Sequence, residues 1–175
     1  EEAFNHTITI NGFSKAYAMT GWRMGYVAAR QDIIKAIMRL QSQVNSSNCS
    51  ISQRAGVTAL LGPQDSVDEM VKEFARRKDY VYERVCKIPD MSCPEPQGAF
   101  YVLCDISKYF GKRYQEWTIN NGYDMSEYLL VTQQVATVPG EAYNIPGKIR
   151  FAYANSMENL KEAFDRIEDA LAKLK

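Results

Sequence analysis

One long amphipathic segment constrains the fold more than any other feature of the sequence. It follows the Gly62-Pro63 break, begins at Asp65, and carries apolar residues at helical spacing along one face. The apolar residues of this face are Val67, Met70, Val71, Phe74, Val81 and Val85. Since Asp65 is a good N-cap residue, the pattern predicts a helix of roughly 23 residues. A helix of that length can run between two structural units, and we place a boundary within it, near residues 76–85.

Shorter segments on both sides of this helix alternate between strand and helix patterns. Strands are predicted over residues 6–10, 26–29, 99–105 and 148–154, which are rich in β-branched and other apolar residues. Helices are predicted over about 31–44, 51–61, 107–120 and 125–133, with a last helix from Ser156 onward. This mixture predicts an α/β or α+β architecture.

Charge and cysteine content exclude several classes of partner. Lys plus Arg number 21 and Asp plus Glu number 21, so the formal net charge is zero. A neutral chain has no bulk attraction to nucleic acid or anionic lipid, and no apolar run reaches the roughly 20 residues that span a bilayer. The cysteines Cys49, Cys86, Cys93 and Cys104 form no CxxC pair, and the only histidine is His6. We therefore expect no metal site, no nucleic acid, no membrane, and free thiols in a reducing compartment.

The densest group of reactive side chains lies on a predicted irregular loop between Asn11 and Tyr26. Ser14 can donate to an anionic oxygen, and Arg23 can form two hydrogen bonds to a phosphate or a carboxylate. Lys15 beside such an anion can act as a nucleophilic amine toward a carbonyl. Taken singly, each residue also fits an ordinary role as a capping serine, a solvated lysine or a surface arginine. The spacing alone indicates only an anion site.

The complete run is more specific than its parts. Residues 14–26, Ser-Lys-Ala-Tyr-Ala-Met-Thr-Gly-Trp-Arg-Met-Gly-Tyr, resemble the pyridoxal-phosphate attachment motif of the class I aminotransferases, the aspartate-aminotransferase-like enzymes of fold type I. The resemblance implies that Lys15 attaches the cofactor covalently and that Ser14 and Arg23 bind its phosphate. It also implies transamination between an L-amino acid and a 2-oxo acid, with Lys15 as the acid and base at the reacting carbons.

A second resemblance lies near the C-terminus. The run Val138-Pro139-Gly140-Glu141-Ala142-Tyr143, followed by residues 147–154, resembles the family segment whose arginine binds the α-carboxylate of the substrate, which maps onto Arg150. Alternation in a strand places Arg150 on one face with Ala152 and Ala154. An arginine between alanines has room for a carboxylate held by two hydrogen bonds. The segment Pro96-Gln97-Gly98-Ala99-Phe100-Tyr101 also resembles the family, and we assign it a structural role.

The resemblance covers essentially all of the chain but only the C-terminal portion of the family. It implies an α/β fold in which residues 1–80 are the C-terminal remnant of the large cofactor-binding domain and residues 81–175 are the α+β small domain. Because the first residue is Glu1 and the family's other cofactor ligands are missing, we expect a fragment of a longer enzyme, inactive by itself. Family members are typically homodimers, with residues 45–52 near the interface, and we expect a cytoplasmic location.

Two other interpretations stay open. A carbon–sulfur β-lyase of the same fold uses the same Ser14, Lys15 and Arg23 positions and diverges from transamination only after the shared carbanion. The chain is alternatively an independently folded module without catalysis. The sequence does not identify the amino-acid substrate.

Overall fold

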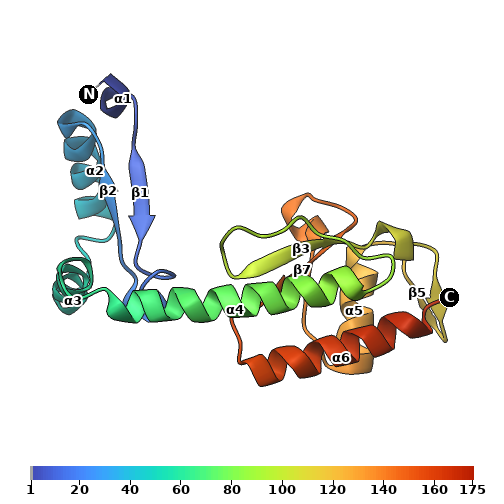
Figure 1. Ribbon diagram of the computed structural model, residues 1–175. Coiled ribbons are helices and arrows are strands. Elements are labelled where there is room, and N and C mark those ends of the chain that lie inside the picture. Colours follow the sequence, from blue (N-terminus) through green and yellow to red (C-terminus); the bar gives the residue numbers. More distant parts are fainter. Residues whose placement is uncertain (1) are drawn as a thin grey trace. The chain divides into compact units, whose positions relative to one another are not determined.

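The chain forms two compact units, a first unit over Glu1–Met70 and a second unit over Val71–Lys175. A computed structural model describes residues 2–175 of the chain. Glu1, the first residue of the expected large-domain segment, lies outside the described residues. The division falls within the long helix α4 (Asp65–Lys87), which has the 23 residues that the apolar pattern predicts (Figure 1). No helix among residues 2–175 combines the length and the apolar composition that crossing a membrane requires.

The first unit contains one two-stranded sheet and several helices. Helix α1 (Glu2–Asn5) is followed by β1 (Thr9–Gly12), which pairs antiparallel with β2 (Gly25–Ala28). Helices α2 (Gln31–Val44) and α3 (Ser50–Leu61) then follow. The predicted strand over residues 6–10 is thus partly wrong. The amide of His6 bonds to the carbonyl of Ala3 at 3.2 Å, so the turn that closes α1 takes the first residues of that segment.

Burial in the first unit is sparse. Phe13, 4% exposed, is the only large hydrophobic side chain that is buried among residues 2–70. Apolar side chains on α2 and α3 are instead open to solvent. Examples are Leu40, 67% exposed, and Ile51, 72% exposed. The amphipathic periodicity of α2 predicts its helix correctly, but the apolar face of this helix finds little to pack against within the first unit.

The second unit holds the hydrophobic core. Strands β3 (Tyr101–Asp105), β7 (Lys148–Ala152) and β6 (Val138–Pro139) form an antiparallel sheet in that order. Helix α5 (Gly122–Gln133) and helix α6 (Met157–Lys173) pack with it, and α6 runs beside the second half of α4 (Figure 1). Arg84 of α4 joins the two helices through bonds of 2.8 Å to Asp165 and 2.8 Å to Glu168.

The predicted helix over residues 107–120 is wrong. A short 3-10 turn, η2 (Ser107–Tyr109), leads into the hairpin of β4 (Arg113–Tyr114) and β5 (Trp117–Thr118). The hairpin turn holds Gln115 at φ 52°, a left-handed conformation that a helix cannot contain. Helix α5 also begins three residues before its predicted start, because the Asn121 side chain accepts the amide of Asp124 and caps it.

Candidate functional site

Residues 13–24 form the loop that joins β1 to β2. Its base is closed by the register pair Gly12–Gly25 and by a hydrogen bond of 3.2 Å from the Phe13 amide to the Met24 carbonyl. A Cβ on Gly25 would lie 2.8 Å from the carbonyl oxygen of Asn11, closer than atoms tolerate. A glycine at this position therefore lets the two strands approach and brings the two ends of the loop together.

The three site residues predicted from the first motif all lie on this loop. Ser14 is half-buried, while Lys15 and Arg23 are exposed. Because Ser14 follows Phe13 and Arg23 precedes Met24, the closing hydrogen bond holds Ser14 and Arg23 at the same end of the loop.

The backbone and the charge of the loop both suit an anion. Arg23 occupies a left-handed conformation, φ 53°, and donates to the Thr20 carbonyl at 2.8 Å, which fixes its direction. The sequence from Phe13 to Met24 contains two cations and no carboxylate. The loop therefore offers a hydroxyl, an ammonium and a guanidinium without a competing negative charge, which suits a phosphate.

Aromatic contacts around the buried Phe13 ring support this loop. The buried Phe13 ring lies 5.6 Å from the ring of Tyr17 and 5.7 Å from the ring of Tyr26, centroid to centroid. The Tyr17 hydroxyl donates to the Gln64 side chain at 3.4 Å. Tyr17 thus anchors the loop, whereas Trp22, nearer the end of the loop that leads into β2, is 44% exposed.

The same loop forms one wall of a cavity of about 490 Å³ in the first unit. Phe13, Met24 and Gly25 come from the loop and its edge, and residues 46–48 contribute two serines and an asparagine. Residues 45–52 are the segment that the resemblance places near a dimer interface, and that placement stays a prediction.

Arg150 lies on β7 in the second unit, with the alternation that the sequence predicts. Ile149 and Phe151 are buried on one face, while Arg150 is half-buried and Ala152 exposed on the other. The Arg150 guanidinium carbon lies 5.1 Å from the ring centre of Tyr101 and 5.1 Å from that of Tyr143. Its Nε is buried and has no hydrogen-bond partner among residues 2–175. A buried N–H without an acceptor is costly, so this group is suited to receive a carboxylate.

The two tyrosines beside Arg150 have no assigned role in the sequence interpretation. Tyr101 lies opposite Ala152 in the β3–β7 register, which puts it on the face of Arg150. Tyr143 ends the short turn η3 (Gly140–Tyr143). Aromatic rings on a guanidinium hold it in place and leave its edge open for an anion. A signal for both was present, since Tyr101 and Tyr143 each end one of the segments that resemble the family.

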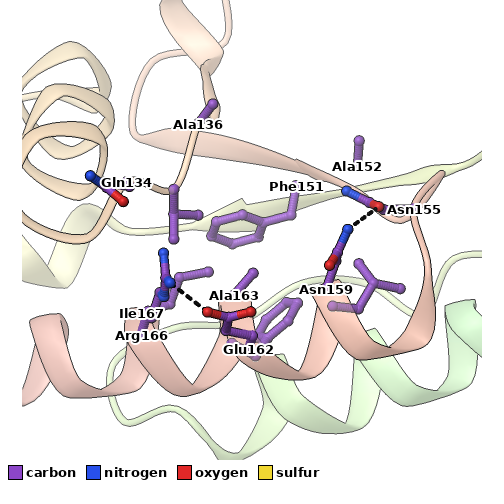
Figure 2. A pocket seen from close by; sticks show the side chains of 13 residues that line it. Gln134, Ala136, Phe151, Ala152, Asn155, Asn159, Glu162, Ala163, Arg166 and Ile167 are labelled. Atoms are coloured by element: carbon purple, nitrogen blue, oxygen red, sulfur yellow. Dashed lines mark hydrogen bonds and ion pairs between the residues drawn. The ribbon is translucent and has the colours of Figure 1, made fainter.

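A separate pocket of about 330 Å³ lies between α6, the end of α5 and β7 (Figure 2). Phe151 and Ile167 provide apolar surface, and Asn155 accepts a hydrogen bond of 2.9 Å from Asn159 at one end. Glu162 pairs with Arg166 at the other end. None of the predicted site residues lines this pocket. Among residues 2–175 there is also no group of three His, Cys, Asp or Glu side chains able to hold a metal ion.

Comparison with known proteins identifies the family. Residues 1–167 match the family described as aminotransferase class I and II. The chain belongs to this family. The chain is 44% identical to a bifunctional aspartate aminotransferase and glutamate/aspartate-prephenate aminotransferase of Petunia hybrida, over 98% of this chain and 37% of that protein. It is 43% identical to a probable aspartate/prephenate aminotransferase of Rickettsia conorii, over 93% of this chain and 41% of that protein.

The architecture of this aminotransferase chain agrees with solved structures. The aspartate aminotransferase of Rhizobium meliloti superimposes with a TM-score of 0.94 at 43% identity, over 98% of this chain and 43% of that one. The α/β fold is therefore that of part of a fold type I aminotransferase, as the resemblance implies. The chain spans about two fifths of the length of the curated relatives it matches.

Proposed function

We propose that these residues belong to a pyridoxal-phosphate-dependent aminotransferase, a transferase that moves an amino group between an L-amino acid and a 2-oxo acid. The closed loop at residues 13–24 carries this proposal, because it gathers Ser14, Lys15 and Arg23 without a carboxylate among them. The names of the relatives favour transamination over the β-lyase and over a module without catalysis. Since those names mention aspartate, aspartate is the amino acid to test first.

The donor set of the loop fits the proposed cofactor. We assign the cofactor phosphate to the Ser14 hydroxyl and the Arg23 guanidinium, and its covalent attachment to the Lys15 amine. When bound, pyridoxal phosphate supplies an electron-accepting ring that stabilises negative charge on the substrate Cα. In the proposed reaction, Lys15 takes the proton from the substrate Cα and returns a proton to C4′ of the cofactor.

Arg150 is proposed to bind the α-carboxylate of the substrate. The support is its buried Nε, which has no hydrogen-bond partner among residues 2–175, and the position of its guanidinium 5.1 Å from the ring centres of both Tyr101 and Tyr143. Two hydrogen bonds from a guanidinium that is held in place fix the orientation of a carboxylate. The substrate bond between Cα and its proton, which must break, then keeps a fixed orientation. This contribution is one of positioning.

We further propose the domain assignment and the assembly that the resemblance implies. Residues 1–80 would be the C-terminal part of the large cofactor-binding domain and residues 81–175 the small domain. The division at Met70 and Val71 lies in the same helix as that boundary. The functional enzyme would be a cytoplasmic homodimer. We expect the 175-residue chain alone to lack transaminase activity, since its first unit has little core of its own.

Reductive labelling tests the assignment of Lys15. Borohydride traps even a transient bond between a lysine and pyridoxal phosphate, so weak cofactor binding is sufficient for the measurement. At low cofactor concentration we expect the label on Lys15, with at least tenfold less on other lysines. Lys15→Ala should remove this label without increasing it elsewhere.

Lys35 on α2 is the matched control, because it is also exposed and lies in the same unit. Lys35→Ala should leave the labelling of Lys15 unchanged. Label distributed equally over the exposed lysines, in the wild type and in Lys15→Ala alike, would refute the assignment.

A further inference from the structure

Cys93 and Cys104 face each other across a short antiparallel contact that precedes the sheet of the second unit. The Asp105 amide donates to the Ser92 carbonyl at 2.7 Å, and the Ser92 amide donates to the Asp105 carbonyl at 3.4 Å. Ser92 and Asp105 are therefore a hydrogen-bonded pair. The next pair along this register, Cys93 and Cys104, is of the non-hydrogen-bonded kind, in which Cα atoms lie about 4.5 Å apart and side chains are closest.

The two thiols interact directly and differ in accessibility. A hydrogen bond from Cys104 lowers the pKa of the Cys93 thiol. The same hydrogen bond and burial raise the pKa of the Cys104 thiol. Cys93 is half-buried and Cys104 is fully buried. The pair thus offers one accessible sulfur that ionises readily and a second sulfur directly behind it.

We propose that Cys93 and Cys104 form a reversible disulfide when the chain meets a low-molecular-weight disulfide such as oxidised glutathione. The Cys93 thiolate attacks one sulfur of oxidised glutathione, and the first glutathione leaves as a thiolate that takes up a proton. The Cys104 thiol then loses its proton and attacks the Cys93 sulfur, which releases the second glutathione. Two protein thiols are oxidised to one disulfide, and one glutathione disulfide is reduced to two thiols.

The spacing expected from this register suits the bond. Disulfides join residues whose Cα atoms lie about 4.4–6.8 Å apart, and the spacing of a non-hydrogen-bonded pair falls within that range. The bond would close a loop over residues 93–104 and tie the segment after α4 to β3. In the β3–β7 register, Cys104 lies opposite Ile149 and the adjacent Leu103 lies opposite Arg150. Oxidation would therefore stiffen the strand next to the one that carries the proposed carboxylate-binding arginine.

Cys86 is the rival partner. It is exposed on α4, where its interaction with Tyr82 raises the pKa of that tyrosine, and its charge also raises the pKa of Cys104. It has no strand register with Cys93 or Cys104, and so nothing on the backbone holds it at disulfide spacing. Cys49 is also exposed but belongs to the first unit, which makes it a suitable control.

Peptide mapping of the whole chain after incubation with oxidised glutathione tests the proposal. We expect a cross-linked peptide containing Cys93 and Cys104, a mass lower by two hydrogen atoms, and a fall in alkylatable thiols from four to two. Reductant should reverse all three changes. The thermal midpoint of the oxidised chain should rise by roughly 5–10 °C. Cys49→Ser and Cys86→Ser should retain the cross-link, and Cys93→Ser should lose it.

The mapping on the wild-type chain keeps the proposal falsifiable even if Cys93→Ser folds poorly. A disulfide through Cys86 or Cys49 in place of the Cys93–Cys104 bond would overturn it. So would glutathione that stays on Cys93 while Cys104 remains alkylatable after denaturation, because the buried thiol would then have failed to resolve the mixed disulfide.

Discussion

The carboxylate of Glu141 accepts a hydrogen bond of 2.9 Å from the backbone amide of Gly122, the first residue of α5. Its second oxygen is buried and has no hydrogen-bond partner among residues 2–175. Negative charge at a helix N-terminus is favourable, so Glu141 stabilises the start of α5 from the turn η3. That turn ends at Tyr143, one of the two rings beside Arg150. The contact thus links a helix end in the core to the proposed carboxylate site.

Removal of the Glu141 carboxylate should destabilise the second unit. We expect Glu141→Ala to lower the free energy of unfolding by about 1–3 kcal/mol, because the Gly122 amide loses its acceptor. Glu141→Gln should cost less, since an amide oxygen can still accept that bond. Urea unfolding measures both losses. Glu127→Ala, at an exposed position on α5, is the control and should change little. Equal stability of Glu141→Ala and wild type would contradict this role.

Gly140 is required where the chain enters η3. A Cβ at this position would lie 2.2 Å from the Ile145 carbonyl oxygen and 2.8 Å from the Lys148 Cβ, so the backbone itself would have to move. We expect Gly140→Ala to lower the free energy of unfolding by about 1–3 kcal/mol. Gly98→Ala should be nearly neutral, because among residues 2–175 no atom beyond the two chain neighbours of Gly98 lies within 4 Å of the added carbon. A neutral Gly140→Ala would show that this turn adapts more easily than its contacts indicate.

The ion pair between Asp105 and Lys148 should make stability depend on pH. The Lys148 ammonium, 2.5 Å away, and then the Ser107 hydroxyl lower the pKa of Asp105 to about 2. Because this folded value lies below the unfolded value of about 3.9, the stabilisation is complete above the unfolded pKa and is lost as pH falls toward about 2. Each side chain is about one third exposed, so we discount the contribution to about 1 kcal/mol.

Asp105→Asn provides the measurement for this pair. The difference in unfolding free energy between wild type and Asp105→Asn should be about 1 kcal/mol at neutral pH and shrink as pH falls from about 5 to 3. The corresponding difference for Glu127→Gln should not follow that course. A difference for Asp105→Asn that stays constant over this range would exclude the ion pair as its cause.

Substitution of Arg150 should separate stability from ligand binding. Arg150→Met keeps an unbranched side chain that reaches about as far as the Arg150 Nε, beside Tyr101 and Tyr143. It removes a buried N–H that has no acceptor among residues 2–175, so stability should be unchanged or higher. Addition of a dicarboxylate such as succinate should raise the thermal midpoint of the wild type but not of Arg150→Met. An equal rise in both chains would argue against Arg150 as the carboxylate-binding residue.

The sequence predicts the helices more reliably than the hairpins. Apolar periodicity locates α2, α4 and α6 almost to the residue, because in these helices one face is consistently apolar. Helix α3 is also predicted to within one residue, and the Gly62-Pro63 break marks its end. The periodicity fails over residues 107–120, because the left-handed residue of the hairpin turn is Gln115 and not the glycine or asparagine that usually marks such a turn. The sequence interpretation also begins α5 at residue 125 in place of Gly122, although Asn121 is a good N-cap.

The proposed site is predictable in part. The face of Arg150 follows from strand alternation, which needs only local sequence. Its contacts with Tyr101 and Tyr143 depend on the pairing of β3 with β7 and on the path of η3. Neither the strand pairing nor the path of the turn can be predicted from a single sequence. The closure of the loop at residues 13–24 depends likewise on the β1–β2 register.

The loop that carries Lys15 rests on one buried ring, that of Phe13, whereas the second unit has an extensive core. Local opening should therefore occur first in the first unit. Limited trypsin digestion should cut after Lys15 and Arg23 long before it reaches the sheet of the second unit, and simultaneous cleavage in both units would contradict this order. Proteolytic damage would then remove the residues proposed for chemistry while the core persists. A chain whose circular dichroism still indicates a folded protein can therefore already have lost the loop that is proposed to bind the cofactor.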